Sequence, residues 1–299
     1  MDIRKTITRN ACAKINLGLD VVGVREDGYH LLRMIMQQID VFDTLTFTVT
    51  DAQGTGEIRL IDESGLSPDG QDNLICRAIR MMEEKYHLCA DIEVRLIKRI
   101  PVAAGLAGGS TDAAAAFTAV RDLLLPQVTD SELMELGVRL GADIPYCIAG
   151  GIKLSEGIGE ILTALPPMPE CAIVLIKPEE SASTAHVYKA VDSLGGYHHP
   201  DIDGQIEALR AGDLRGLAER CENVLELVTG EDLPVIGRIE DFLIKQGALG
   251  ACMSGSGPSV FGIFETREQA ENARQAFLQT ESASGCRSFV CTPVSDSGM

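Results

Sequence analysis

Apolar residues recur along the chain with two different periods. Apolar and polar residues alternate, with β-branched enrichment, over 44–50 and 91–97, and this pattern predicts half-buried strands. Apolar residues at helical spacing predict a helix over 73–87, with Asp72 as its N-cap. An alanine-rich run predicts a buried helix that begins near Ser110, because alanine has the best helix propensity. The first half of the chain therefore mixes strands and helices.

The stretch around residue 140 predicts a further helix followed by a rigid joint. The helix covers 131–140, with the hydroxyl of Ser131 as its N-cap, and it ends at Gly141. Asp143 follows this helix and precedes Pro145. Its carboxylate is therefore expected on a fixed, non-helical joint, which suits a group that must meet a substrate hydroxyl.

The second half of the chain starts after a proline-rich segment. Residues 165–170 (LPPMPE) contain three prolines, which oppose both helix and strand. We therefore expect one domain over residues 1–164 and a second over 165–299. The predicted helices beyond the boundary are 184–193, 203–211, 213–228, 233–245 and 266–279, and the predicted strands are 171–176, 249–253, 258–264 and 287–292. Strands and helices interleave in both halves, so the expected fold class is α+β with two domains.

Composition limits the classes of partner. The 299 residues include 44 Asp and Glu against 26 Lys and Arg, which gives a formal net charge of −18. A polyphosphate surface would repel such a chain, so we expect no general binding to nucleic acid or to an anionic membrane. No apolar run approaches the roughly 18–20 residues needed to span a bilayer, and the N-terminus lacks the apolar core of a signal peptide. We expect a cytoplasmic protein.

Cysteine and histidine give no metal-site pattern. The nine cysteines are scattered without a C-x-x-C pair, and we expect most of them to be buried and reduced. His198 and His199 are adjacent but have no thiol or carboxylate partner at ligand spacing. We expect them in a loop.

A loop of small residues is the strongest chemical signal. It runs PVAAGLAGGSTD from Pro101 to Asp112, between a predicted strand and the alanine-rich helix. Small residues let the backbone approach a ligand, and free N–H groups at a helix start favour a phosphate. Gly109 precedes Ser110 where a Walker A loop has lysine, and the G-x-G-x-x-G motif is missing. A tight turn with close helix packing would use the same residues, so the loop alone leaves both interpretations open.

Two other segments could contribute to the same site. Residues 250–259 (GACMSGSGPS) form a second small-residue loop between two short predicted strands, although a simple turn would look alike. Over residues 11–19, apolar positions alternate with Lys14, Asn16 and Gly18, so that Lys14 and Asn16 share one face of a strand. That face offers a cation and an amide to one site, or is merely solvated.

These three segments, in this order, resemble the GHMP kinase superfamily, which includes galactokinase and the homoserine, mevalonate and phosphomevalonate kinases. Further segments resemble one branch of the superfamily, whose alcohol substrate carries a cytidine diphosphate group. They are REDGYH at 25–30, DNLI at 72–75, GADIP at 141–145 and the turn at 157–159. The resemblance extends from Ala11 to Phe264.

The resemblance implies an enzyme that transfers the γ-phosphoryl group of ATP to the 2-hydroxyl of this substrate, in the non-mevalonate route to isoprenoid precursors. It implies a GHMP kinase fold, with an N-terminal domain of the ribosomal S5 domain 2 type and a ferredoxin-like C-terminal domain. The site would lie in the cleft between them. ATP and Mg²⁺ are the implied cofactors, and the partners are small molecules. Separately from the resemblance, we expect a weak homodimer.

The resemblance also implies roles for individual residues. Asp143 would be the base, and Lys14 would be the cation beside it. Lys14 would keep the carboxylate of Asp143 ionised and would help to neutralise charge as the alkoxide attacks. The hydroxyl of Ser110 or Thr111 would meet Mg²⁺, with Ser110 as the expected ligand. The implied ATP contacts are Pro101, Val102, Ala103, Ala104, Gly105, Leu106, Ala107, Gly108, Gly109, Ser110, Thr111 and Asn73. The implied contacts with the cytidyl substrate are Asn16, Tyr29, His30, Tyr188, Gly255 and Ser256.

Other functions remain open from the sequence. A superfamily member that acts on homoserine, mevalonate or a sugar would share the nucleotide loop, although Tyr29, His30 and Tyr188 suit a pyrimidine ring. A nucleotide-binding regulator without catalysis would not need both Lys14 and Asp143. A Rossmann dehydrogenase is a poorer match, because its fingerprint and acidic ribose partner are missing.

Overall fold

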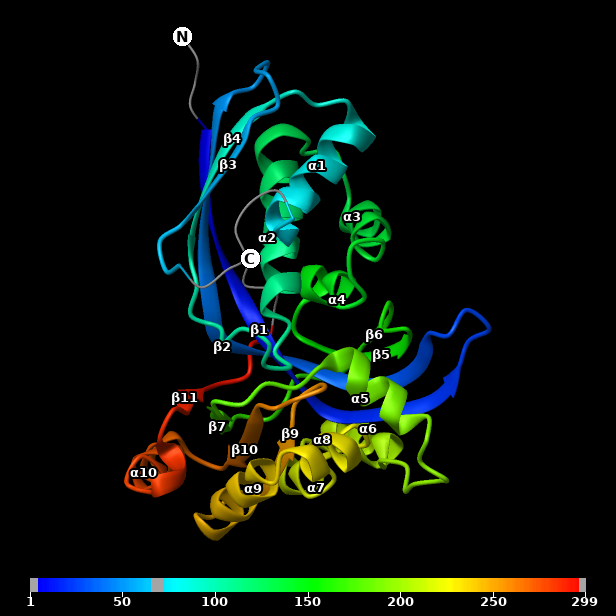
Figure 1. The fold of residues 1–299 in the computed structure, drawn as a ribbon, viewed down its shortest axis with the longest axis vertical. Helices are drawn as coiled ribbons and strands as arrows, with labels where there is room; N and C mark the ends of the chain where they lie inside the picture. The colour runs from blue at the N-terminus through cyan, green and yellow to red at the C-terminus, as the bar shows by residue number, and fades with distance from the viewer. Residues whose placement is uncertain (1–4, 66–71, 296–299) are drawn as a thin grey trace.

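The computed structural model describes residues 5–65 and 72–295, whose strands form two sheets (Figure 1). The seven-stranded sheet contains β1 (Lys5–Val24), β2 (His30–Asp51), β3 (Ile58–Asp62), β4 (Asp91–Ile97), β5 (Ile152–Gly157), β6 (Ile161–Ala164) and β8 (Glu222–Asn223). The four-stranded sheet contains β7 (Ala172–Lys177), β9 (Gly250–Met253), β10 (Val260–Phe264) and β11 (Arg287–Cys291).

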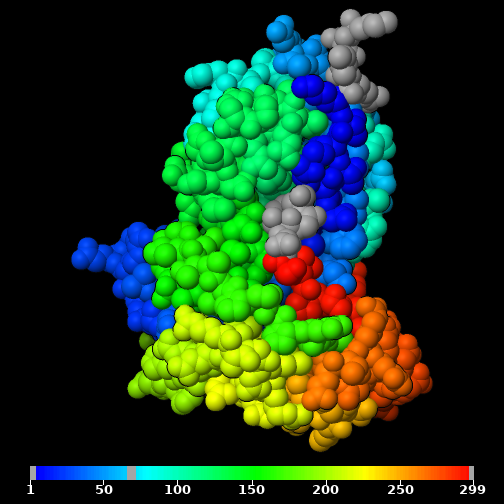
Figure 2. Space-filling model, turned by 180° about the vertical axis from the view of Figure 1, so that it is seen from behind, coloured from blue at the N-terminus to red at the C-terminus, as the bar shows by residue number. Residues whose placement is uncertain are grey.

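A long antiparallel pair, β1 and β2, forms the centre of the first sheet. The register runs from Lys5 opposite Val49 to Val24 opposite His30. The register shifts on both sides of Lys14 and Asn16, and such irregularities bend a strand and redirect its side chains. The far ends of the two strands project from the molecule as a hairpin (Figures 1 and 2). The strands predicted from 11–19 and 44–50 are therefore parts of two much longer strands.

Helices cover one face of this sheet. They are α1 (Leu74–Tyr86), α2 (Gly108–Leu124), α3 (Asp130–Gly137) and α4 (Ile144–Ala149) (Figure 1). The alanines at 113–116 of α2 are fully buried, and α2 packs against α1, β1 and β2. Small side chains let α2 lie close to the sheet, and this placement brings its first turn next to β1.

The second sheet has the ferredoxin-like arrangement that the resemblance implied. Its order is β11-β7-β10-β9, and every neighbouring pair is antiparallel. This order follows from a β-α-β-β-α-β chain in which several helices fill the first crossover. The helices are α5 (Thr184–Val191), α6 (Ile202–Ala211), α7 (Leu214–Ala218), α8 (Glu226–Asp232), α9 (Val235–Lys245) and α10 (Arg267–Phe277), and a 3-10 turn covers Glu281–Ala283.

Two predicted helix starts were wrong. The N-cap of α1 is Asn73 and not Asp72, because the Asn73 side chain accepts the N–H of Ile75 at 2.9 Å. The N-cap of α3 is Thr129 and not Ser131, because Thr129 forms a reciprocal capping box with Glu132. Helix α3 also ends at Gly137, before the predicted end at 140.

Two longer predictions also need correction. The predicted helix over 213–228 is interrupted: α7 ends at Ala218, and β8 pairs with β1 before α8 begins. The buried Asn223 explains the break, because its amide donates to the carbonyls of Met253 and Gly255, both at 2.8 Å. Asp143 was expected on a non-helical joint, but it is the N-cap of the short helix α4. Helix α4 and strands β5 and β6 had not been predicted.

Residues 165–170 lack regular structure, as expected for a linker. However, β8 follows this segment and still joins the first sheet. The described residues after β11 also contact β2, where the N–H of Val294 donates to the carbonyl of Gln38 at 2.9 Å, and Figure 2 shows a red C-terminal segment between the two parts. The division at residue 164 therefore stays a prediction.

The remaining general expectations can be compared with the structure. All nine cysteines are free; six are buried, Cys221 and Cys286 are half-buried, and Cys89 is exposed. His198 and His199 lie in the loop before α6 and face carboxylates of Glu222 and Asp20. Within residues 5–65 and 72–295, no helix combines the length and the apolar character that a bilayer span needs.

Two carboxyl groups meet where α8 and α9 pack near β9. Glu226 Oε2 accepts the N–H of Met253 at 3.1 Å, which helps to fix the loop after β9. Burial and the neighbouring Glu226 raise the pKa of Glu240 to about 9, and burial raises the pKa of Glu226 as well. At neutral pH the folded pair therefore holds a proton that the unfolded chain releases.

This proton predicts a pH dependence of stability. The free energy of unfolding should fall as pH rises from the ordinary glutamate range to about 9, because the native pair gives up its proton only at the top of that window. Glu240→Gln should reduce this fall, since the amide has no proton to lose. Urea unfolding at several pH values measures the effect. The exposed Glu207→Gln on α6 is the control, and parallel curves for wild type and Glu240→Gln would contradict the assignment.

Candidate functional site

A cavity of about 1030 Å³ lies where the two sheets meet. Its walls come from β1, β2, the loop after β4, the first turn of α2, the start of α4, α5 and the loop after β9. Every predicted site residue except Thr111 lines it. Thr111 is fully buried, and its N–H donates to the carbonyl of Ala107 at 2.9 Å.

The loop after β4 has a backbone suited to an anion. Its φ angles are positive at alternate residues: 51° at Ala103, 74° at Gly105 and 56° at Ala107. Alternation of this kind turns successive N–H groups toward one point and forms an anion-binding nest. Ala107 is the N-cap of α2 and offers no side-chain cap. The N–H groups of residues 108–110 have no backbone acceptor within the described part of the chain, and the helix dipole favours negative charge there.

Gly105 is the point where this loop contacts the loop after β9. A Cβ at position 105 would lie 2.1 Å from the carbonyl oxygen of Ser254. The Gly105 carbonyl accepts hydrogen bonds from Ser254 Oγ at 3.0 Å and from Lys14 Nζ at 3.1 Å. A Cβ at Gly255 would in turn lie 3.0 Å from the Gly105 carbonyl oxygen. Only residues without side chains allow the two backbones to come this close.

Lys14 supplies positive charge to the cavity. The residue is 5% exposed, and its Nζ also donates to Oδ1 of Asn16 at 2.6 Å. No carboxylate of the described residues forms an ion pair with Lys14, so its charge is not neutralised locally. A buried ammonium without a counter-ion favours an anionic ligand beside it.

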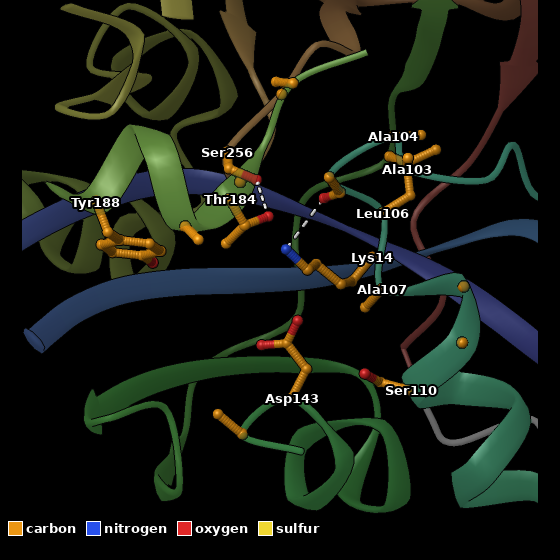
Figure 3. Close-up of a pocket in the computed structure, with 18 of the residues that line it drawn as sticks. Lys14, Ala103, Ala104, Leu106, Ala107, Ser110, Asp143, Thr184, Tyr188 and Ser256 are labelled. Atoms are coloured by element: carbon orange, nitrogen blue, oxygen red, sulfur yellow. Dashed lines mark hydrogen bonds between the residues drawn. The ribbon is translucent and has the colours of Figure 1, made fainter. Parts of the chain in front are cut away.

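Asp143 faces the same space. It is half-buried, and its carboxylate makes no capping bond to α4. Figure 3 shows the carboxylate pointing toward the ammonium of Lys14 and the Ser110 hydroxyl pointing to the space beside it. The cavity therefore combines a carboxylate, an ammonium and a hydroxyl next to an anion-binding loop.

A buried ionic cluster supports the start of α2. Lys98 Nζ lies 2.5 Å from Asp43 Oδ2 and 2.7 Å from Asp112 Oδ2. Burial raises the pKa of Asp112 to about 8, against the opposing effect of the Lys98 ammonium. Lys98 and Asp112 line the cavity. Neither was predicted as a site residue, because charged residues 14 apart in the chain show no local pattern.

The other end of the cavity is aromatic. The rings of His30 and Tyr188 lie 4.9 Å apart with an interplanar angle of 35°, and burial raises the pKa of Tyr188. Tyr29, at the hairpin turn, is 59% exposed and lines the cavity mouth. Two further residues that had not been predicted also lie here: Thr184, the first residue of α5, is hydrogen-bonded to Ser256 at 2.8 Å, and Asp192, the C-cap of α5, lies 2.7 Å from His30. Their spacing from Tyr188 on one helix face could have indicated them.

Comparisons with known proteins agree with this architecture. Residues 73–151 match the family model of the GHMP kinases N terminal domain, and residues 205–282 match that of the GHMP kinases C terminal. The 4-diphosphocytidyl-2-C-methyl-D-erythritol kinase of Lachnospira eligens is 49% identical over 275 residues, which are 92% of this chain and 94% of that protein.

Two solved structures are similar in fold over nearly the whole chain. A crystal structure of 4-(cytidine 5'-diphospho)-2C-methyl-D-erythritol kinase is 30% identical, with a TM-score of 0.80, over 96% of this chain and 99% of that one. A homoserine kinase from Cytophaga hutchinsonii matches with a TM-score of 0.76 at 19% identity, over 99% of this chain and 97% of that one. At that identity the second match shows the fold alone.

The close approach at Gly105 predicts a strong effect of a single methyl group. Gly105→Ala should lower the free energy of unfolding by about 2–4 kcal/mol, because alanine disfavours a positive φ and its Cβ would overlap the Ser254 carbonyl. Urea unfolding measures the change. Gly195→Ala is the matched control, since no atom lies within 4 Å of a Cβ built at Gly195. Equal, small effects of the two substitutions would contradict the proposed contact.

Proposed function

The chain belongs to the GHMP kinase family, and on this premise we propose that it transfers the γ-phosphoryl group of ATP to the 2-hydroxyl of 4-diphosphocytidyl-2-C-methyl-D-erythritol. The observation that carries the proposal is the 49% identity to a kinase of that name over 92% of the chain. The family models, one in each half, confirm the two-domain α+β fold expected from the sequence. The cytoplasmic location and the weak homodimer stay predictions.

We place the ATP phosphates at the loop after β4 and the first turn of α2. The alternating positive φ angles and the free N–H groups of residues 108–110 support this placement. Asn73 lies at the start of α1 and lines the same cavity, consistent with its predicted contact to the nucleotide. Thr111 has no access to the cavity, so we limit the loop contacts to residues 101–110.

Asp143 and Lys14 would carry the chemistry. Asp143 would accept the hydrogen bond of the attacking hydroxyl and orient its oxygen toward the γ-phosphorus. It would take the hydroxyl proton as the new O–P bond forms and the bond from the γ-phosphorus to the leaving ADP breaks. Lys14 would hold the oxygens of the transferred group and balance their charge. Phosphoryl transfer has a loose transition state, so alignment of the two reactants contributes more than complete proton removal.

A Mg²⁺ ion fits this site only together with the nucleotide. Within the described residues, no three His, Cys, Asp or Glu side chains are grouped to hold a metal. The Ser110 hydroxyl faces the cavity, and a hydroxyl oxygen with phosphate oxygens is a suitable ligand set for a hard cation (Figure 3). We propose that Ser110 meets Mg²⁺ bound to ATP, where the ion would neutralise phosphate charge.

The cytidyl substrate would occupy the opposite end of the cavity. Tyr29, His30 and Tyr188 offer aromatic surface to a pyrimidine, while Gly255 and Ser256 lie between this end and Lys14. Asn16 would assist Lys14, to which it is hydrogen-bonded. A homoserine or mevalonate substrate has no base for the aromatic end, and a silent regulator would not need both Lys14 and Asp143.

The choice of acceptor tests the proposed function. Purified protein with Mg²⁺ and ATP should form ADP only when 4-diphosphocytidyl-2-C-methyl-D-erythritol is present, because both ends of the cavity must be filled to align the hydroxyl. A coupled ADP assay with homoserine, mevalonate and galactose as alternative acceptors measures the preference. Equal turnover of any of these acceptors would refute the assignment.

The role of Asp143 gives a second test. Asp143→Asn should lower kcat by about 10²–10⁴-fold, because the amide keeps the shape but cannot take the proton. Isothermal titration should show that the variant still binds the cytidyl substrate. Asp241→Asn, an exposed change on α9, is the control for loss of a carboxylate. A normal kcat in Asp143→Asn would remove Asp143 from the chemistry.

A further inference from the structure

A short segment beside the cavity connects the two sheets. It covers residues 222–229, which contain β8 and the start of α8, and we call it the bridging segment. Strand β8 pairs in parallel with β1 at Gly18 and Leu19, and the N–H of Val224 donates to the carbonyl of Leu19 at 3.0 Å. One side of the bridging segment is therefore fixed to the strand that carries Lys14.

The amide of Asn223 connects the bridging segment to the loop after β9. Asn223 is 3% exposed, and its Nδ2 donates to the carbonyls of Met253 and Gly255, both at 2.8 Å. Its Oδ1 accepts the N–H of Leu225 at 3.0 Å. The partners assign the two ends of the amide, because only the nitrogen can donate to carbonyls and only the oxygen can accept an N–H.

Two further side chains of the bridging segment bond to the same stretch of backbone. Glu226 Oε2 accepts the N–H of Met253 at 3.1 Å, and Thr229 Oγ1 donates to the carbonyl of Ser256 at 3.3 Å. Together with the amide of Asn223, these contacts fix the backbone over 253–256. The position of this backbone relative to β1 is thus set by the bridging segment.

The loop after β9 in turn limits the space around Lys14. A Cβ at Gly255 would lie 3.2 Å from Nζ of Lys14 and 3.0 Å from the carbonyl oxygen of Gly105, to which Nζ donates. The ammonium is therefore confined between the backbones of two loops. A shift of the loop after β9 would let the ammonium move, and a misplacement of about 1 Å in a catalytic site can cost about 10²-fold in rate.

We infer that Asn223 is a positioning residue for phosphoryl transfer: its amide holds the loop after β9 next to β1 and so fixes the ammonium of Lys14 beside Gly105. This inference rests on the proposed function, because that function assigns Lys14 to the transferred phosphoryl group. Asn223 does not line the cavity and acts through Gly255. Its loss should lower kcat with little effect on ATP binding, because the anion-binding N–H groups lie on the first turn of α2.

The test replaces the amide of Asn223 by a carboxyl group of nearly the same shape. In Asn223→Asp, one oxygen can still accept the N–H of Leu225, but the carboxyl group donates at most one of the two bonds to Met253 and Gly255, and none when it is ionised. We expect kcat with the cytidyl substrate to fall by about 10–10²-fold and KM for ATP to change by less than about threefold. A coupled ADP assay under conditions where urea unfolding shows the variant to be folded measures both.

The matched control is Gln205→Glu. Gln205 is fully buried on α6, and its Nε2 donates to the carbonyls of Leu17 at 2.8 Å and Arg220 at 3.0 Å. This amide also bridges two carbonyls, one of them on β1, but it does not bond to the loop after β9. The control should lower the midpoint of urea unfolding about as much as Asn223→Asp, with kcat within about twofold of wild type. An equal fall in kcat in both variants would overturn the inference.

A milder variant covers the case in which Asn223→Asp does not fold. Thr229→Val keeps the shape of a buried side chain but removes its bond to the carbonyl of Ser256. The value of kcat should fall by about 2–5-fold, again with KM for ATP nearly unchanged. Thr118→Val is its control, because the buried Thr118 bonds only to carbonyls of its own helix, at 3.0 Å to Ala114 and 3.2 Å to Ala115.

Failure of this inference can be told apart from failure of the proposed function. No turnover of the cytidyl substrate by wild type would refute the proposed function and this inference with it. Normal wild-type turnover together with a wild-type kcat in Thr229→Val, and in Asn223→Asp where it folds, would refute this inference alone. A loss of ATP affinity as large as the fall in kcat would also overturn it, because a general loosening of the cavity affects both quantities.

Discussion

The contact at Gly105 is the constraint on which the rest of the cavity depends. One carbonyl oxygen receives Lys14 from β1 and Ser254 from the loop after β9, so three segments far apart in the chain meet at a single backbone atom. Lys14 loses little freedom when a ligand arrives, because Asn16 and Gly105 already hold its ammonium. Such preorganisation lowers the entropy cost of binding and fixes the cation where charge develops. The two sheets are thereby joined at the site itself.

This arrangement reconciles an acidic chain with an anionic ligand. The net charge of −18 describes the whole chain, whereas the anion-binding elements are backbone N–H groups and one ammonium that lacks a counter-ion within the described structure. Backbone dipoles at a nest and a helix start act only over a few ångströms. Solvent and salt screen the distant surface carboxylates much more than the buried Lys14. Local geometry therefore decides ligand charge, and net charge decides only the response to extended polyanions.

The sequence predicted which residues line the cavity better than it predicted the boundaries of the elements. The small-residue loops could be found because a close approach of two backbones requires glycine or alanine, and these residues are visible in the sequence. Lys14 could be found because it shares one face of a predicted strand with Asn16. The capping residues were misplaced because neighbouring polar residues such as Asp72 and Asn73 have similar capping preferences, and tertiary packing chooses between them. The helix predicted over 213–228 failed for a related reason: the helical pattern did not reveal that the buried amide of Asn223 would donate to one carbonyl of β9 and one of the loop after it. Lys98 and Asp112 were missed because their ionic cluster includes Asp43 from a distant part of the chain, whereas the helical spacing of Asp192 from Tyr188 was a local signal that could have indicated it.

The position of Asp143 shows how a local error can leave a functional assignment intact. The sequence predicts a rigid, non-helical joint for Asp143 because Pro145 follows, whereas in the structure Asp143 is the N-cap of α4. Proline is tolerated in the first turn of a helix, so it stiffens this start without breaking it. An N-cap aspartate commonly bonds to the N–H groups of its own helix, yet here the side chain makes no such bond. The carboxylate of Asp143 does not cap α4 but faces the cavity. This is the placement expected of a side chain that contacts a ligand and does not stabilise its own helix.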